Sequence, residues 1–125
     1  MGEIKGVGID LVDIETFRAK LTPELIDEVF LPEEKAYCSS QTRSWENYAA
    51  RFAAKEAVFK ALGHGLAQGL RFRQVEVVRD TSTGAVSLRL SGRALEVMKE
   101  AGVKELPLSL SHTRKAAIAI VIAQG

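Results

Sequence analysis

The sequence predicts one small domain that combines helices and antiparallel strand pairs around a single long helix. The chain has 125 residues, which is the size of one domain, so residues 1–125 are expected to share one core. Two pairs of strand-like segments are each joined by turn residues, and the clearest helical segment covers residues 44–62. Hydrophobic residues make up 46% and charged residues 26%, which argues against a disordered or collagen-like chain.

The N-terminal part predicts one strand followed by short helices. Residues 4–11 are rich in β-branched side chains, and Gly6 and Gly8 among them would let another backbone approach closely. Asp10 falls at the C-terminal end of this strand. Three short helices are expected next, beginning at Asp13, at Thr22-Pro23 and at Pro32.

The helix over residues 44–62 is expected to begin at Ser44 as N-cap and to stop at Gly63. Apolar side chains occur around nearly its whole circumference, which predicts a largely buried helix. Glu56 and Lys60 are four residues apart and therefore project from one side of it.

The C-terminal part predicts a hairpin, a helix and a second strand pair. The hairpin covers residues 72–79 and 85–90, and a helix follows that is capped by Ser91 and ends at Gly102. The second strand pair covers residues 106–111 and 116–123. The last strand is apolar at every position, so both of its faces are expected to be covered by helices, by another sheet or by a neighbouring subunit.

Composition and charge exclude several classes of partner. A net charge of +1 argues against a nucleic-acid binder, and no apolar segment reaches the length of a membrane span. The N-terminus does not have the pattern of a secretory signal, and the single Cys38 excludes an internal disulfide. A buried, unreactive thiol and a cytoplasmic location are expected.

Glu56 and Lys60 have two interpretations. They can form an intrahelical ion pair, which is common in helical proteins and contributes about 0.3–0.5 kcal/mol. Alternatively, Glu56 is a ligand for a hard cation and Lys60 is a point charge for a phosphate. The spacing alone leaves both open and favours the ion pair.

Two further residues carry the same ambiguity. Asp10 at a strand end is either a turn-capping residue or a carboxylate that binds a divalent ion beside substrate phosphates. His112, next to Ser111 and Thr113, is either a turn histidine satisfied by backbone or a group that binds a phosphate or a base.

Four segments, taken in order, resemble one known family. They are GIDLVDI (residues 8–14), RFAAKEA (residues 51–57), KALG (residues 60–63) and SLSHT (residues 109–113). In this order and at this chain length they resemble the holo-[acyl-carrier-protein] synthases, which are small bacterial 4'-phosphopantetheinyl transferases. The resemblance covers essentially the full chain.

The resemblance implies a transferase that moves the 4'-phosphopantetheine group of coenzyme A to a serine of apo acyl carrier protein, in fatty acid or polyketide synthesis. Adenosine 3',5'-bisphosphate is released and magnesium is the cofactor. By this resemblance Asp10 and Glu56 are the magnesium ligands and Lys60 contacts the diphosphate, while Glu56 or a metal-bound water takes the serine proton. The implied coenzyme contacts are Arg51, Lys60, Gly63, Ser111, His112 and Thr113.

The family fold is α+β and typically trimeric, with sites between subunits, so a homotrimer is expected. Two residues depart from the usual family pattern, His64 and Phe59, and both are expected to reshape the coenzyme pocket. The first helix, which receives the acidic carrier in the family, offers mainly Arg18 and Lys20 here, so electrostatic steering should be weaker.

Two other functions are compatible with the candidate residues. One is a magnesium-dependent hydrolase of a nucleotide pyrophosphate, because the same Asp, Glu and Lys serve that chemistry. The other is a non-catalytic oligomeric binding module in which Glu56 and Lys60 simply pair.

Overall fold

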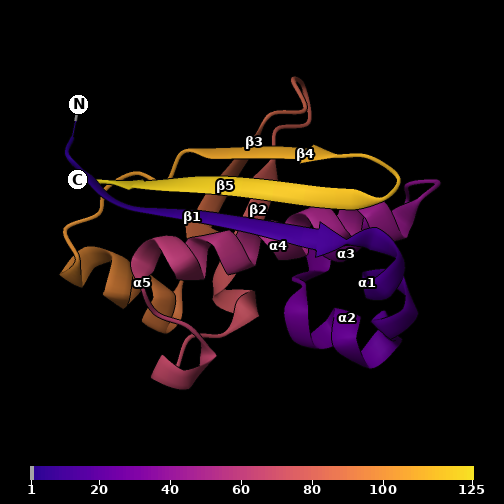
Figure 1. Cartoon of the computed structure of the whole chain (residues 1–125), viewed down its shortest axis with the longest axis horizontal. Coiled ribbons are helices and arrows are strands. Elements are labelled where there is room, and N and C mark those ends of the chain that lie inside the picture. The colour runs from indigo at the N-terminus through magenta and orange to yellow at the C-terminus, as the bar shows by residue number, and fades with distance from the viewer. Residues whose placement is uncertain (1) are drawn as a thin grey trace.

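The structure is a computed structural model, and it describes residues 2–125. The chain forms an α+β domain in which one long helix lies against a three-stranded sheet (Figure 1). In chain order the elements are β1 (Ile4–Asp13), α1 (Ile14–Lys20), α2 (Pro23–Val29), α3 (Pro32–Ser39), α4 (Ser44–Leu62), the 3₁₀ turns η1 (Leu66–Gln68) and η2 (Phe72–Gln74), β2 (Val75–Arg79), β3 (Val86–Leu90), α5 (Gly92–Glu100), β4 (Leu108–His112) and β5 (Ala116–Gln124).

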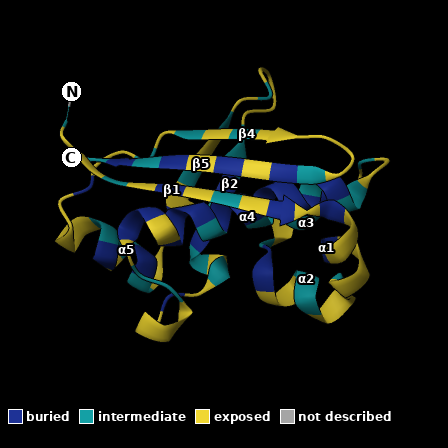
Figure 2. Ribbon diagram, in the orientation of Figure 1, coloured by how far each residue is buried: buried dark blue, intermediate teal, exposed yellow. Residues whose placement is uncertain are grey.

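The larger sheet has the strand order β1-β5-β4 and is antiparallel, and β2 and β3 form a separate hairpin. On β5 the side chains toward α4 are small and fully buried, for example Ala117, Ala119 and Ala123. Ile118 and Ile120 alternate with them and are exposed. Figure 2 shows this alternation as buried and exposed bands along β5. Within this chain only the α4 face of the last strand is covered, so cover of its other face by a neighbouring subunit stays a prediction.

The contact between β1 and α4 is unusually close because two glycines on β1 face the helix. A Cβ atom on Gly8 would overlap the carbonyl oxygen of Ala57, and one on Gly6 would overlap that of Ala61. The prediction that these glycines permit close backbone approach is confirmed. The next two residues of β1 on the same face are Asp10 and Val12.

The predicted elements are all present, with shifted ends. Asp13 caps α1 by accepting from the Thr16 amide at 2.9 Å, and Thr22 caps α2 by accepting from the Leu25 amide at 3.2 Å. Two expectations are wrong in detail. The N-cap of α4 is Arg43 and not Ser44, and β1 continues to Asp13, so Asp10 lies inside the strand instead of at its end.

A buried ion pair fixes the opposite side of α4. The Lys55 ammonium donates to Glu34 of α3 at 2.9 Å, and both side chains are 0% exposed. Lys55 also donates to the carbonyl oxygens of Phe72 and Val75, while Glu34 accepts from the Val77 amide at 2.8 Å. Because every polar atom of the pair has a partner, the network joins α3, α4 and β2 without an uncompensated charge.

Cys38 is fully buried, as expected, and burial raises the pKa of its thiol to about 11. Within residues 2–125, no helix combines the length and the apolar character needed to cross a bilayer.

The glycine contact leads to a stability prediction. Gly8→Ala should lower the free energy of unfolding by about 1–3 kcal/mol, because its methyl group must push β1 away from α4. The control is Gly65→Ala, where the nearest heavy atom would be the Gln68 side-chain oxygen at 3.8 Å. Urea unfolding of both variants measures the difference. Equal stability of the two variants would show that the close contact is not needed.

Candidate active site

The structure brings Asp10, Glu56 and Lys60 together where β1 crosses α4. The Lys60 ammonium donates to the Asp10 carboxylate at 3.0 Å and to the Ile9 carbonyl oxygen at 3.0 Å. The Asp10 side chain is only 15% exposed. Among residues 2–125, the ion pair of Lys60 is therefore with Asp10 on β1, and the alternative of a pair with Glu56 within the helix is wrong.

Glu56 lies beside this pair in a partly apolar setting. Its carboxyl group is half-buried on α4, and Phe52 and Phe59 lie one turn away on either side of it along the helix. The pKa of Glu56 is raised, first by burial and second by the negative charge of Asp10, while the Lys60 charge acts in the opposite direction. Two carboxylates that repel one another at the surface of a groove are a favourable setting for a cation.

Two hollows meet at Glu56 and Lys60. One has a volume of about 530 Å³ and lies between β1, α1 and α4, with Phe17 and Phe52 in its lining. The other, of about 310 Å³, is lined by Phe59 and by the segment that follows α4, which includes Gly63 and His64. The site can therefore accept an extended substrate on both sides of the charged residues. Gly63 and the two departures from the family pattern, Phe59 and His64, lie in the smaller hollow.

The donor set fits magnesium better than a metal held by protein ligands alone. Asp10 and Glu56 offer two carboxylates, and among residues 2–125 no group of three or more His, Cys, Asp or Glu side chains is arranged to hold a metal. Magnesium commonly binds to one or two carboxylates and completes its coordination with water and substrate phosphates. The Lys60 ammonium on the Asp10 oxygen adds a positive charge for the same phosphates.

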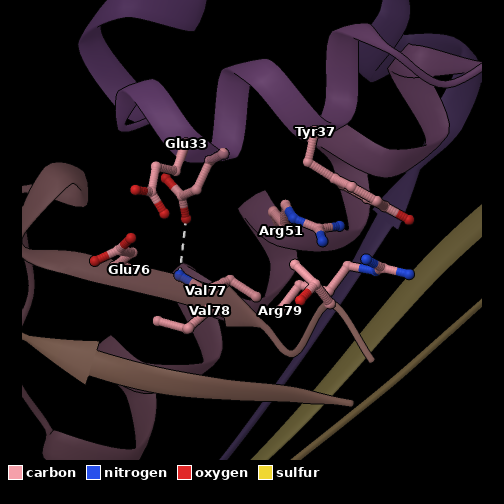
Figure 3. Close-up of a pocket in the computed structure, with 9 residues that line it drawn as sticks. Glu33, Tyr37, Arg51, Glu76, Val77, Val78 and Arg79 are labelled. Atoms are coloured by element: carbon pink, nitrogen blue, oxygen red, sulfur yellow. Dashed lines mark hydrogen bonds between the residues drawn. The ribbon is translucent and has the colours of Figure 1, made fainter. Parts of the chain in front are cut away.

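Arg51 does not join this group. It lies on α4 nine residues before Lys60, about two and a half turns, and so faces the opposite side of the helix. Its guanidinium stacks on the Tyr37 ring at 4.6 Å, and Arg79 stacks on the same ring at 4.8 Å. Figure 3 shows Arg51, Tyr37 and Arg79 together at one side of a pocket of about 140 Å³, with Glu33 and Glu76 at the other.

The three candidates at the end of β4 also lie apart from Asp10. Strand β5 separates β4 from β1, and His112 pairs with Ala117 while Asp10 pairs with Ala119. His112 faces α4, and its Nε2 atom is 3.4 Å from a carboxylate oxygen of Glu46. Ser111 faces the open side of the sheet, beside Ile118.

Thr113 belongs to the turn between β4 and β5. Its hydroxyl oxygen accepts from the amides of Lys115 at 3.1 Å and Ala116 at 3.2 Å, so its O–H remains available as a donor. One chain thus brings Asp10, Glu56, Lys60 and Gly63 together as a first group. The remaining candidates, Arg51, Ser111, His112 and Thr113, lie outside it at separate positions and are called the second group.

Sequence reasoning missed several polar residues around these groups. Lys55 stands directly before Glu56 but points to the other side of α4, and a charge in the middle of an otherwise apolar face was the available signal. Tyr37, Arg79 and Glu46 gave no such signal, because their partners are distant in the sequence.

The comparisons agree with this fold. Residues 6–121 match the family described as the 4'-phosphopantetheinyl transferase superfamily. The chain belongs to this superfamily, since the match covers nearly its whole length.

Similar proteins narrow the class further, to the holo-[acyl-carrier-protein] synthases. A protein of that name from Geobacter sp. (strain M21) is 43% identical over 122 residues, which are 95% of this chain and 97% of the relative. The crystal structure of the holo-ACP-synthase from Plasmodium yoelii has a TM-score of 0.85 at 27% identity and covers 100% of this chain and 98% of that chain. The Helicobacter pylori enzyme in complex with coenzyme A has a TM-score of 0.80 at 27% identity, covering 94% of this chain and 99% of that chain.

The charges around Glu56 lead to a titration prediction. In metal-free protein, Asp10→Asn should lower the pKa of Glu56, because a repelling charge is removed, and Lys60→Met should raise it, because an attracting charge is removed. Carboxyl-carbon NMR titration of Glu56 measures both shifts. A shift in the same direction in both variants, or none in either, would contradict the arrangement of the three side chains.

Proposed function

We propose that this protein transfers the 4'-phosphopantetheine group of coenzyme A to a serine of apo acyl carrier protein. The observation that supports this most directly is the cluster of Asp10, Glu56 and Lys60 at the junction of two hollows, in a chain of this superfamily. A diphosphate at the junction would leave room for the pantetheine arm on one side and for the incoming serine on the other.

The reaction exchanges one P–O bond for another. The serine oxygen attacks the β-phosphorus of coenzyme A, a new serine O–P bond forms, and the bond from that phosphorus to the bridging oxygen breaks. Adenosine 3',5'-bisphosphate leaves with the electron pair, and the serine hydroxyl gives up its proton. The site must therefore neutralise charge, hold the groups in line and accept one proton.

Asp10 and Glu56 would hold magnesium, which supplies charge neutralisation at the diphosphate when bound. Lys60 spans from α4 to the β1 strand, so its ammonium is held beside Asp10, where it would support the charge that develops on the leaving bisphosphate. Phe52 and Phe59 on either side of Glu56 give the site apolar walls, which would limit the access of water to a bound diphosphate.

The proton of the serine has two possible acceptors at this site. The raised pKa of Glu56 makes its carboxylate a better base than an ordinary glutamate, which suits direct proton transfer. As a metal ligand, Glu56 would instead leave this task to a water molecule in the same site. In both cases the proton is removed beside Glu56.

The second group of residues is proposed to come from a neighbouring copy in a homotrimer. Arg51, His112 and Thr113 offer a guanidinium, an imidazole and a hydroxyl donor, which suit the nucleotide end of coenzyme A, and Ser111 precedes His112 on β4. In one chain they lie away from Asp10.

The open face of the sheet supports association of copies. It carries a row of exposed apolar side chains, of which Leu11 is 68% exposed. The others are Val7, Ile9, Ile118 and Ile120. An apolar patch of this kind on a small domain is typical of a surface that associates with another protein. A second and a third copy would cover it and bring the two groups of residues together.

The carrier would approach the larger hollow. Helix α1 forms one wall of it, and Lys20 stands at this wall as a cation for an acidic partner. Arg18 on the same helix is held against the Trp45 ring at 3.6 Å. We propose a carrier of fatty acid or polyketide synthesis as the partner. The alternative pyrophosphate hydrolase finds no support in the named relatives.

Transfer is tested directly by mass spectrometry. Incubation of the protein with coenzyme A, magnesium and apo acyl carrier protein should add the mass of one phosphopantetheinyl group to the carrier. Asp10→Asn and Glu56→Gln should each reduce the rate by about 100-fold or more, since each removes a charge needed at the diphosphate. The control Glu100→Gln, on exposed α5, should retain the wild-type rate. Cleavage of coenzyme A without modification of any carrier would support the hydrolase instead.

The shared site predicts complementation between two inactive variants. Asp10→Asn and Arg51→Ala should each have little activity alone, but co-refolded mixed assemblies should recover part of the wild-type rate, because some sites combine an intact Asp10 with an intact Arg51. Light scattering should give a trimer for the wild-type protein and a smaller species for Leu11→Glu. A monomeric wild-type protein, or no recovery in mixtures, would refute the composite site.

A further inference from the structure

The carboxylate of Glu46 is almost buried and lies between two basic side chains, outside the residues that carry the proposed reaction. Glu46 lies in the first turn of α4, and its side chain is only 8% exposed. One oxygen is 3.6 Å from Nε of Arg43, and the other is 3.4 Å from Nε2 of His112. It therefore links the beginning of α4 to the end of β4, which is 66 residues further along the chain.

The position of Glu46 on the helix explains only part of this arrangement. A negative charge near a helix N-terminus is favourable, and an Arg three residues earlier adds an ion pair. The same spacing occurs on α5, where Arg93 contacts Glu96 at 3.1 Å, but there the carboxylate is 65% exposed. Glu46 is almost buried, so it pays a larger desolvation cost and needs the second partner that His112 provides.

His112 gains a defined orientation from this contact. It is the last residue of β4, an edge strand, and 40% of its side chain is exposed. Without a partner the ring would be free to rotate. With Nε2 held toward Glu46, the Nδ1 atom lies on the other side of the ring and is free to contact a ligand. A carboxylate that holds one ring nitrogen fixes how the other is presented.

We propose that Glu46 is a positioning residue that holds His112 in the orientation in which it binds the nucleotide end of coenzyme A. This rests on the proposed function, because it assumes that His112 contacts the coenzyme. Glu46 itself would not touch the substrate. Its effect on coenzyme binding should therefore depend entirely on the presence of His112.

Steady-state kinetics at saturating carrier test this with a double-mutant cycle. Glu46→Gln should raise the KM for coenzyme A by about tenfold and change kcat by less than about twofold, since binding and not the chemical step is affected. His112→Ala should raise the KM at least as much. In the His112→Ala background, Glu46→Gln should have no further effect on the KM.

The matched control is Glu96→Gln, which removes the carboxylate of the equivalent pair on α5 and should leave KM and kcat unchanged. Thermal unfolding of each variant separates a loss of fold from a loss of binding. An additive rise of KM in the double variant, or an unchanged KM in Glu46→Gln, would overturn the positioning role. Failure of the wild-type protein to modify any carrier would instead refute the proposed function.

Discussion

The close packing of β1 on α4 is the constraint on which the site depends. Because Gly6 and Gly8 have no side chains, the strand backbone lies against the helix at Ala57 and Ala61. Asp10 is the next residue on this face of the strand, so its carboxylate reaches the Lys60 ammonium on the helix. Larger residues at the glycines would separate the two elements and with them the charged groups. The small residues at the contact of β1 and α4 thus also set the distance between Asp10 and Lys60.

Helix α4 carries a buried structural charge and the charges of the candidate site on different sides. Lys55 points to α3 and β2, where Glu34 and backbone carbonyl oxygens satisfy it completely. Its neighbour Glu56 points into the groove, where burial and the Asp10 charge raise its pKa. A fully buried charge that lost its partner would cost about 3–5 kcal/mol, so Lys55 locks the rotation of the helix about its axis. That rotation decides where Glu56 and Lys60 stand.

Local sequence signals predicted the helices and strands well, because caps and turns depend on residues that are close in the sequence. The caps at Asp13 and Thr22 and the close approach at Gly8 could be read from residue types alone. The N-cap of α4 is Arg43, although Ser44 was expected there. Residue preference does not locate the end of a helix to within one residue. The partner of Lys60 could not be predicted from helical spacing, because Asp10 is 50 residues away and reaches it only through the fold.

The candidate residues fall into two groups partly because α4 presents Arg51 and Lys60 on different sides. Arg51 and Lys60 belong to one continuous α4 but face opposite sides, and they line different pockets of the chain. The motif RFAAKEA therefore contains residues for two different surfaces. In the proposed function a neighbouring copy of the chain supplies Arg51 to the site, and the exposed apolar face of the sheet would be the surface for that assembly. Under that proposal, correct folding of one copy would be a condition for the reaction in the site of its neighbour.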